Sequence, residues 1–264
     1  MTERYAVIGQ PVAHSKSPVI HARFAQATGH DIEYGLIEPP LDGFEAAVHA
    51  FRAAGGRGLN VTVPFKEEAF RYCDELSERA RVAQAVNTLV FGERVFGDNT
   101  DGVGLVRDLE DNLSVPLAGK RVLLMGAGGA GQGVVGALLE ARVGALVVAN
   151  RTLGRAQALA ARFAGAQASA YESLEGPFDV VVNATSAGLS DDEIALPAQV
   201  LGKGMLAYDM TYGRDTAFLR QSRSAGARAC DGLGMLVEQA AESFFVWRKV
   251  RPATAPVLAG LRGG

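Results

Sequence analysis

Residues 120–155, KRVLLMGAGGAGQGVVGALLEARVGALVVANRTLGR, carry the strongest structural pattern in the chain. The apolar run 122–125 is short and dense, which is typical of a buried parallel strand. The following sequence GAGGAG, residues 126–131, fits G-x-G-x-x-G, and apolar residues then recur at helical spacing before a second apolar run at 145–149. We therefore predict a strand, a glycine loop, a helix and a strand within about 30 residues, the order found in dinucleotide-binding units.

The glycine spacing has a physical reason. One glycine makes the tight turn, one lets the backbone approach a pyrophosphate, and one lets helix and strand pack closely. The helix start adds free N–H groups and the positive end of the helix dipole. Because the chain contains 32 glycines, a glycine-rich turn without a ligand is the alternative for the pattern alone. The order of elements favours a cofactor site formed by Gly126, Ala127, Gly128, Gly129, Ala130 and Gly131.

The end of the second strand indicates which dinucleotide binds. An NAD site usually has an acidic residue about 20 residues after the glycines. Here Asn150 stands 19 residues after Gly131, and Arg151, Thr152 and Arg155 follow it. Two guanidinium groups and a hydroxyl suit the 2′-phosphate of NADP(H), which a carboxylate would repel. The alternative is a solvated basic helix start, although cations are disfavoured in a first helical turn.

Composition restricts the class of protein. The 264 residues suggest about two domains, and 48% hydrophobic with 21% charged residues is typical of a globular protein. No segment reaches the length of a membrane span, and the net charge of −3 gives no basic surface for nucleic acid. Cys73 and Cys230 lack redox or metal-ligand spacing, and the N-terminus lacks a signal-peptide pattern. We expect a cytoplasmic protein with reduced thiols, no metal site, and neither a membrane nor a nucleic-acid partner.

Alternating strand and helix patterns extend on both sides of the glycine loop and predict an α/β fold with parallel sheets in both halves. In the first half, strands are expected at 5–8, 32–37 and 58–63, helices at 18–28, from 44, from 64 and at 76–85, and a hairpin at 86–96. In the second half, helices are expected at 153–163, 218–225 and 232–250, and strands at 178–182, 206–210 and 227–230.

The loop HSKSP, residues 14–18, precedes the first predicted helix. Pro18 suits its first position and Ser17 its N-cap. One hydroxyl is enough for capping, but the loop carries His14, Ser15 and Ser17 together. Hydroxyls and free N–H groups at a helix start suit the carboxylate of a small substrate. Plain capping is the alternative.

Two further residues occur in first helical turns. Lys66 is unfavourable there, and the positive helix end would favour its neutral amine, which suits proton transfer. A solvated surface lysine is the alternative. Asp101 stabilises a helix start without any further role, so its alternative is structural. After the glycine loop, small residues at 183–188 end a strand, where such sheets bind ligands. Met235 and Gln239 lie one turn apart, and Met235 suits either the core or a cofactor contact.

Taken together, the motifs resemble those of the shikimate dehydrogenase family over nearly the whole chain. These are GQPVAHSKSP (9–18), GLNVTVPFK (58–66), AVNT (85–88), GDNTDG (97–102), GAGGAG (126–131), NRT (150–152), NATSAG (183–188), YDMTY (208–212) and DGLGMLVEQAA (231–241). The resemblance implies NADPH-dependent reduction of 3-dehydroshikimate to shikimate in chorismate and aromatic amino-acid biosynthesis. Two departures are Gln84, where family members often have glycine, and the loop 189–196.

The resemblance also implies domains and residue roles. The substrate domain would comprise 1–101 plus 238–264, and a Rossmann-like doubly wound NADP-binding domain 102–237. The substrate-binding residues would be Ser15, Ser17, Thr62, Asn87, Tyr212 and Gln239, and the catalytic residues Lys66 and Asp101. Besides the glycine loop, the cofactor would contact Asn150, Arg151, Thr152, Arg155, Thr185, Met210, Gly232 and Met235.

In the implied reaction Lys66 exchanges a proton with the substrate oxygen, and Asp101 orients Lys66. A nearby carboxylate favours the ammonium, whereas burial and the helix end favour the amine, and the sequence leaves this balance open. A quinate/shikimate dehydrogenase using NAD as well, and a non-catalytic NADP-sensing module, are the remaining alternatives. A methylenetetrahydrofolate dehydrogenase is disfavoured, because the HSKSP loop suits a small acid. The small-molecule substrate is the expected partner, and a homodimer is compatible with the sequence.

Overall fold

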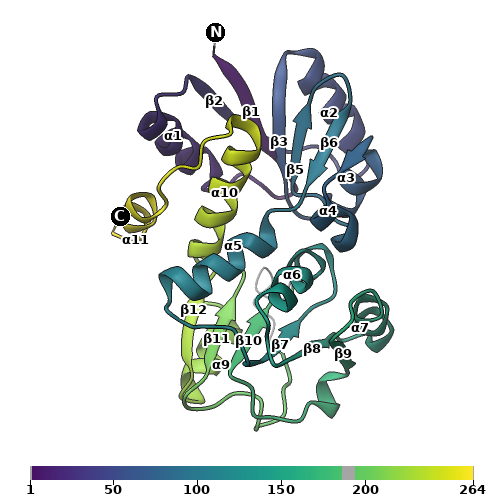
Figure 1. Ribbon diagram of the computed structural model, residues 1–264, viewed down its shortest axis with the longest axis vertical. Coiled ribbons are helices and arrows are strands. Elements are labelled where there is room, and N and C mark those ends of the chain that lie inside the picture. Colours follow the sequence, from purple (N-terminus) through teal and green to yellow (C-terminus); the bar gives the residue numbers. More distant parts are fainter. Residues whose placement is uncertain (1, 186–193, 264) are drawn as a thin grey trace. The chain divides into compact units, whose positions relative to one another are not determined.

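The computed structural model describes residues 2–185 and 194–263. The chain divides into two compact units (Figure 1), which are treated separately below. Unit 1 consists of Met1–Gly104 and Leu236–Gly264, and unit 2 of Leu105–Met235. Unit 1 is therefore discontinuous in sequence, whereas unit 2 is one continuous segment.

Unit 1 contains a six-stranded sheet with strand order β2-β1-β3-β5-β6-β4. Its elements are β1 (Glu3–Ile8), α1 (Ser17–Thr28), β2 (Ile32–Ile37), α2 (Phe44–Ala53), β3 (Gly56–Val61), α3 (Lys66–Tyr72), β4 (Glu75–Leu76), α4 (Glu78–Ala83), β5 (Thr88–Phe91), β6 (Val95–Asp98), the start of α5 (Asp101–Arg107), most of α10 (Leu233–Arg248) and α11 (Ala255–Arg262). β1 pairs in parallel with β2 and β3, but β5 is antiparallel to both β3 and β6. The parallel pairing of β1 with β2 and β3 agrees with the expected parallel layer, and the hairpin expected at 86–96 is present as β5 and β6. The antiparallel pairing of β5 with β3 was not predicted.

This mixed topology gathers several strand ends at one edge. Ile8 pairs with Val61, Asn60 pairs with Thr88, and Thr88 pairs with Asp98. The carboxyl ends of β1, β3 and β6 therefore meet the amino end of β5. We call this the site edge of unit 1, because the segments leaving these strand ends contain most of the predicted substrate residues.

The unit 1 sheet is covered on both faces. Ala6, Ile8, Leu59 and Val61 lie in a buried cluster with side chains of α2, α3 and α4. An aromatic cluster comprises His21 and Phe24 of α1, Tyr34 of β2, and Phe244 and Trp247 of α10. The His21 ring stacks on Tyr34 with centroids 4.2 Å apart. Complete burial, partly opposed by Asn60, lowers the pKa of His21 to about 3, so the ring is neutral at physiological pH.

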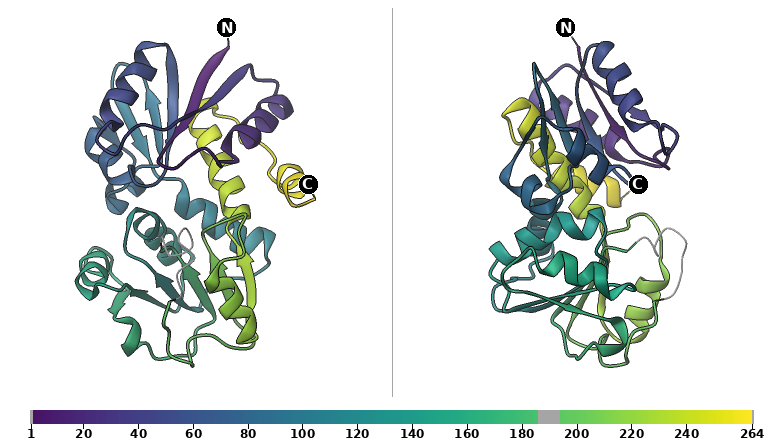
Figure 2. Two further views of the ribbon diagram at one scale, coloured as in Figure 1. Left: turned by 180° about the vertical axis from the view of Figure 1, so that it is seen from behind. Right: turned by 90° about the vertical axis from the view of Figure 1, so that its right-hand side faces the viewer.

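The C-terminal helix α11 lies against α1 in the views of Figures 1 and 2. A guanidinium hydrogen of Arg23 in α1 is donated to the carbonyl oxygen of Val257 in α11, with a nitrogen–oxygen distance of 3.4 Å. An added Cβ at Gly260 would overlap the Arg23 guanidinium, so the small residue allows this close approach. The C-terminal segment is thereby packed onto the helix that follows the HSKSP loop.

Unit 2 contains a six-stranded sheet, all parallel, with order β12-β11-β10-β7-β8-β9. Its elements are the end of α5, the π-helix η1 (Asp108–Asn112), β7 (Arg121–Met125), α6 (Gly129–Glu140), β8 (Ala145–Ala149), α7 (Leu153–Ala160), β9 (Ala166–Ser169), the 3-10 helix η2 (Tyr171–Ser173), β10 (Val180–Asn183), β11 (Leu206–Asp209), α9 (Ala217–Ser224), β12 (Arg228–Asp231) and the first turn of α10. Numbered within the unit, this is the order 3-2-1-4-5-6 of the Rossmann fold, so the doubly wound prediction is confirmed. Its switch point lies between β7 and β10.

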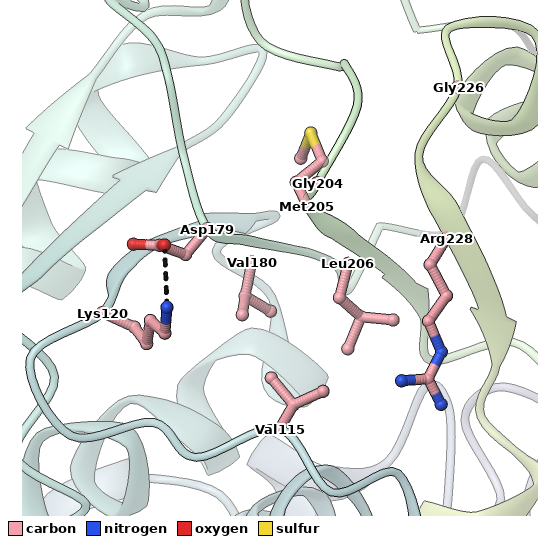
Figure 3. Close-up of a pocket in the computed structure, with 9 residues that line it drawn as sticks. All are labelled: Val115, Lys120, Asp179, Val180, Gly204, Met205, Leu206, Gly226 and Arg228. Carbon is pink, nitrogen blue, oxygen red and sulfur yellow. Dashed lines mark hydrogen bonds and ion pairs between the residues drawn. The ribbon is translucent and has the colours of Figure 1, made fainter.

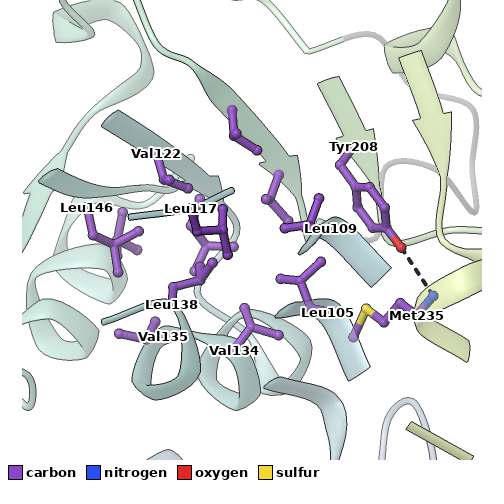
Figure 4. Packing of buried hydrophobic residues seen from close by; sticks show 14 of the residues in the cluster. Leu105, Leu109, Leu117, Val122, Val134, Val135, Leu138, Leu146, Tyr208 and Met235 are labelled. Atoms are coloured by element: carbon purple, nitrogen blue, oxygen red, sulfur yellow. Dashed lines mark hydrogen bonds between the residues drawn. The ribbon is translucent and has the colours of Figure 1, made fainter. Parts of the chain in front are cut away.

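Alternation along the strands explains the two layers of the unit 2 core. Val122 and Leu124 of β7 face one cluster, together with Val134 and Leu138 of α6 (Figure 4). Leu123 and Met125 face a second cluster that includes side chains of α9. Both faces are apolar, as the dense hydrophobic run 122–125 predicts.

Several local predictions are wrong. Ser17 is not the N-cap of α1: the helix begins at Ser17, the cap position is Lys16, and the Ser15 hydroxyl accepts a hydrogen bond from the Ser17 N–H. The helix expected at 76–85 is shorter, because Leu76 pairs in β4 and Ser77 caps α4. Strands β4 and β9 and helix α11 were not predicted. The loop 189–196 lies largely outside the described residues. In the described part of the chain, no helix combines the length and apolar character needed to cross a bilayer.

Candidate active site

A buried ion pair lies at the site edge of unit 1. Lys66 is the first residue of α3 and Asp101 the first residue of α5. The Lys66 Nζ atom lies 2.6 Å from Asp101 Oδ2, and the side chains are only 12% and 5% exposed. The structure therefore brings together the two residues predicted to be catalytic. An ammonium carries three hydrogens, so Lys66 can contact this carboxylate and still donate to a second oxygen.

Asn87 fixes the other oxygen of the carboxylate. Its Nδ2 donates to Asp101 Oδ1 over 2.9 Å, while its Oδ1 accepts from the Thr100 backbone N–H and the Thr88 hydroxyl, each at 2.9 Å. A backbone N–H can only donate, so the orientation of the amide is unambiguous. Asp101 is consequently held with Oδ2 directed at Lys66.

Gln239 of α10 belongs to the same group in unit 1. Its Oε1 accepts from Asn87 Nδ2 at 3.2 Å and from the Thr100 hydroxyl at 3.3 Å, and its Nε2 donates to the Leu236 carbonyl. Four predicted residues from distant parts of the sequence, Lys66, Asn87, Asp101 and Gln239, are thus joined by hydrogen bonds. The family resemblance implies that these residues form one site, and the hydrogen bonds of the structure join them.

The remaining unit 1 candidates also follow strands that end at the site edge. The Ser17 hydroxyl and the Thr62 hydroxyl have no hydrogen-bond partner among the residues that the structure describes, although Ser17 is buried. The loop after β1 approaches the end of β3 closely: Gln10 N–H donates to the Val63 carbonyl, and a Cβ at Gly9 would overlap the Thr62 side chain. Hydroxyls without partners at this edge are suited to a polar substrate.

In unit 2, the glycine loop has the geometry expected for a pyrophosphate. Gly126 has a φ of +104° and directly follows β7, and an added Cβ would lie 2.9 Å from the Ala184 carbonyl carbon. A Cβ at Gly131 would overlap the Gly126 carbonyl oxygen, so this glycine permits close helix packing. At Gly128, before the first turn of α6, a Cβ would meet no atom within 4 Å. The open space at the helix N-terminus fits a pyrophosphate.

The residues after β8 present a basic surface. Arg151, Thr152 and Arg155 are exposed, and neither arginine forms an ion pair within the described ranges. Asn150 accepts from the Ala127 N–H at 3.4 Å and donates to the Thr152 carbonyl at 3.0 Å, which links this turn to the glycine loop. Two uncompensated guanidiniums beside the loop fit a phosphate ester.

The other cofactor candidates lie near the carboxyl ends of β10 and β11. The Thr185 hydroxyl donates to Asn183 Oδ1 over 2.7 Å. A Cβ at Gly232 would overlap the Met210 carbonyl oxygen, so these two residues are adjacent. Met235 is 5% exposed and packs in the unit 2 core beside Tyr208 (Figure 4). Tyr212, predicted to bind substrate, follows β11 in unit 2. Their contacts with ligands stay predictions.

Buried polar residues around the ion pair were not predicted. Thr88, Thr100 and Ser243 are completely buried, and Asn60 is nearly so. Each forms hydrogen bonds within the group that contains Asn87. A polar residue inside an apolar strand or helix face is a usable signal, as Asn60 is in GLNV and Ser243 is in AAESFF.

A cavity of about 390 Å³ lies in unit 2, at the amino ends of β10 and β11 (Figure 3). Predicted cofactor residues lie at the carboxyl ends of these strands. Its lining includes Val180 and Leu206, the first residues of β10 and β11, and Lys120. Lys120 pairs with Asp179 at 3.1 Å, and Arg228 donates to the Leu113 carbonyl at 3.1 Å. The cationic groups are thus already engaged, and the cavity is not part of the predicted cofactor site.

Comparison with known proteins identifies the family. The sequence profile described as "Shikimate dehydrogenase substrate binding domain" matches residues 7–89, "Shikimate / quinate 5-dehydrogenase" matches 109–215, and "Shikimate 5'-dehydrogenase C-terminal domain" matches 232–262. A shikimate dehydrogenase (NADP(+)) of Methylobacillus flagellatus is 57% identical over 98% of this chain and 99% of its own. The chain belongs to the shikimate dehydrogenase family.

Solved structures agree with this membership. An Ael1 enzyme from Pseudomonas putida has a TM-score of 0.91 at 52% identity, covering 98% of each chain. A shikimate 5-dehydrogenase from Thermus thermophilus, in complex with NADP(H) and shikimate, has a TM-score of 0.88 at 37% identity, covering 99% of each chain. Each of these two structures therefore contains counterparts of both units of this chain.

Proposed function

We propose that this chain catalyses the reversible reduction of 3-dehydroshikimate to shikimate with NADPH. The single observation that carries the proposal is the Lys66–Asp101 pair, 2.6 Å apart and almost fully shielded from water. The pair lies at the site edge of unit 1, where the hydroxyls of Ser17 and Thr62 have no hydrogen-bond partner among the described residues. The chain is 57% identical to a shikimate dehydrogenase (NADP(+)). A sensing module without catalysis would not need a lysine and a carboxylate shielded together.

Substrate binding is assigned to unit 1. The Ser15 and Ser17 hydroxyls at the start of α1 would receive the substrate carboxylate, with Tyr212 of unit 2 as a further predicted contact. Thr62, Asn87 and Gln239 would donate to or accept from the ring hydroxyls. Asn87 has both amide hydrogens within reach of acceptors, so its position is fixed before substrate arrives.

Bound NADPH supplies the hydride that reduces the C3 carbonyl. Lys66 donates a proton from Nζ to the carbonyl oxygen as that oxygen gains negative charge, and it takes the proton back during shikimate oxidation. Asp101 keeps the ammonium oriented through Oδ2, while Asn87 holds Oδ1. The low exposure of both side chains excludes water that would otherwise compete for these hydrogen bonds.

In unit 2, the backbone of residues 126–131 and the start of α6 would bind the pyrophosphate, with Thr185 at the neighbouring strand end. Arg151, Thr152 and Arg155, with Asn150 orienting the turn, would bind the 2′-phosphate. Met210, Gly232 and Met235 would contact the nicotinamide. The absence of a carboxylate at position 150 supports NADP(H) over NAD(H).

The test is the absorbance change at 340 nm when purified protein is mixed with shikimate and NADP⁺. We expect turnover with this pair, and kcat/KM at least about tenfold lower with NAD⁺. Comparable rates with quinate and NAD⁺ would instead assign the dual-specificity function. No turnover with any pair, despite NADP⁺ binding, would assign the sensing function. A cytoplasmic location and a homodimer belong to the proposal, and sedimentation of the purified protein tests the dimer.

A further inference from the structure

One buried serine contacts several of the segments that surround the ion pair. Ser243 lies on α10 one turn after Gln239 and is completely buried. Its Oγ lies 2.9 Å from Asn60 Nδ2, 2.8 Å from Thr88 Oγ1 and 3.2 Å from Thr100 Oγ1. It also lies 3.0 Å from the Gln239 carbonyl oxygen. The hydroxyl therefore contacts residues of β3, β5 and α10 and the residue before α5, all within unit 1.

Counting donors fixes the role of the Ser243 hydrogen and leaves each threonine hydrogen with more than one acceptor within reach. Ser243 has one hydrogen, which it donates to the Gln239 carbonyl, and its lone pairs accept from Asn60 Nδ2 and a threonine hydroxyl. The Thr88 hydrogen has two acceptors within reach, Ser243 Oγ at 2.8 Å and Asn87 Oδ1 at 2.9 Å. The Thr100 oxygen accepts from Asn87 Nδ2 at 2.9 Å, so its own hydrogen is available to Ser243. Each hydrogen in this set has an acceptor.

Removing the serine oxygen would disturb Asn87 on both sides of its amide. Asn60 Nδ2 and the hydroxyls of Thr88 and Thr100 would each lose an acceptor. The two threonine hydrogens would then be shared among the remaining acceptors, which include Asn87 Oδ1. The Thr100 hydrogen is also within 3.2 Å of Asn87 Oδ1 and 3.3 Å of Gln239 Oε1. A changed Thr100 hydroxyl weakens the bond that it accepts from Asn87 Nδ2, and Asn87 then restrains Asp101 Oδ1 less firmly.

We infer that Ser243 is a positioning residue for proton transfer: through Thr88 and Thr100 it fixes the Asn87 amide, and thereby the carboxylate of Asp101 that orients Lys66. Ser243 touches neither reacting atom in this scheme. The inference rests on the proposed function, because it concerns the rate of that reaction.

The experiment compares Ser243→Ala with Ser222→Ala. Ser222 is a matched control: it is also completely buried, and its hydroxyl also donates to the carbonyl four residues earlier, that of Phe218, at 2.7 Å. It lies on α9 of unit 2 and contacts none of the residues named above. Each variant therefore loses one buried serine hydroxyl of a helix. Only Ser243→Ala also loses the contacts with Asn60, Thr88 and Thr100.

The readouts are kcat for shikimate oxidation, KM for NADP⁺ and the midpoint of thermal denaturation. We expect Ser243→Ala to lower kcat by roughly 5- to 50-fold with KM for NADP⁺ within about twofold of wild type. Ser222→Ala should keep kcat within about twofold while its midpoint falls similarly. A purely structural serine would lower the midpoint and leave the kcat of the folded enzyme unchanged.

A fall in kcat of less than about fivefold for Ser243→Ala overturns the inference. If circular dichroism shows that this variant is unfolded, Thr88→Val replaces it under the same criterion, since it removes the hydroxyl that donates to Asn87 Oδ1 without changing side-chain shape. Absence of turnover in the wild-type protein would contradict the proposed function instead, so the two failures are distinguishable.

Discussion

Lys66 and Asp101 are the first residues of two different helices, yet Nζ of the lysine lies 2.6 Å from Oδ2 of the aspartate. Asp101 is favourable at a helix start, whereas Lys66 is not. The carboxylate offsets the unfavourable position of the cation, and burial strengthens the attraction between them. Lys66 is thus held beside a carboxylate and away from solvent, as its proposed role as proton donor requires.

Replacing Lys66 with alanine should remove the proton donor. We expect kcat to fall by roughly 10²–10⁴ with little change in KM for NADPH, because the proposed cofactor site lies in unit 2. Steady-state rates at 340 nm measure both constants. Lys203→Ala, which removes an exposed lysine of unit 2, is the control and should retain the wild-type kcat. An unchanged kcat in Lys66→Ala would exclude this residue from the chemistry.

Alanine substitutions at two glycines of the loop should distinguish an effect on NADP⁺ affinity from an effect on the free energy of unfolding. Gly128→Ala adds a methyl group to open space, so the free energy of unfolding should change by less than about 1 kcal/mol. The same methyl group would occupy space needed by the pyrophosphate, and Kd for NADP⁺ should rise at least about tenfold. Thermal denaturation and calorimetric titration give the two quantities. Wild-type NADP⁺ affinity in Gly128→Ala would contradict the assigned phosphate position.

Gly131→Ala is the counterpart, because its Cβ would overlap the Gly126 carbonyl oxygen. Helix α6 must move to accommodate it, so we expect a loss of about 1–3 kcal/mol in the free energy of unfolding together with weaker NADP⁺ binding. If Gly131→Ala were as stable as Gly128→Ala, the close packing of α6 on this loop would not be required.

Arg151→Ala and Arg155→Ala should change cofactor preference. Each removes an exposed guanidinium that lacks an ion-pair partner in the described residues, and each should raise KM for NADP⁺ by about tenfold. KM for NAD⁺, which has no 2′-phosphate, should stay within about twofold. Arg262→Ala in α11 removes an exposed arginine of unit 1 and should alter neither value. Equal effects on both cofactors would argue against a 2′-phosphate site.

The buried His21 should make the protein sensitive to mild acid. Burial lowers the pKa of His21 from 6.5 to about 3, so the folded protein keeps the ring neutral while the unfolded chain gains a proton below about pH 6.5. The contribution of His21 to the free energy of unfolding is therefore fully present above pH 6.5. It is lost as the pH falls toward 3, by up to about 1.4 kcal/mol per pH unit. The measurement is urea unfolding of wild type and His21→Phe from pH 7.5 to 4.5. Parallel curves for the two proteins would contradict this account.

The sequence predicts unit 2 better than unit 1, and the reason is physical. The strand at 122–125, the glycine loop and the helix after it are local patterns, and parallel topology follows from alternation of strands and helices. In unit 1 the direction of β5 relative to β3 depends on pairing between Asn60 and Thr88, which local periodicity does not encode. β9 (AQAS) has too few apolar residues for a strand pattern, and α11 is short, with Gly260 in its interior weakening the helical pattern.

In the candidate site, too, some residues could be predicted from the sequence and others could not. Lys66, Asn87, Asp101 and Gln239 stand in motifs that point to their chemistry, and the structure joins them by hydrogen bonds. Ser243 belongs to no such motif, and its partners Asn60 and Thr88 are 183 and 155 residues away in the chain. Only the folded arrangement shows that this serine contacts them.

Because unit 1 is made of two separated segments, its assembly depends on the order of synthesis. The ribosome delivers residues 105–235 before residues 236–264, so all of unit 2 emerges while unit 1 still lacks α10. Until then Asn60 and Thr88 have no serine partner, and His21 lacks the rings of Phe244 and Trp247. A nascent chain interrupted before residue 236 therefore contains all of unit 2 but lacks Gln239, Ser243 and most of α10.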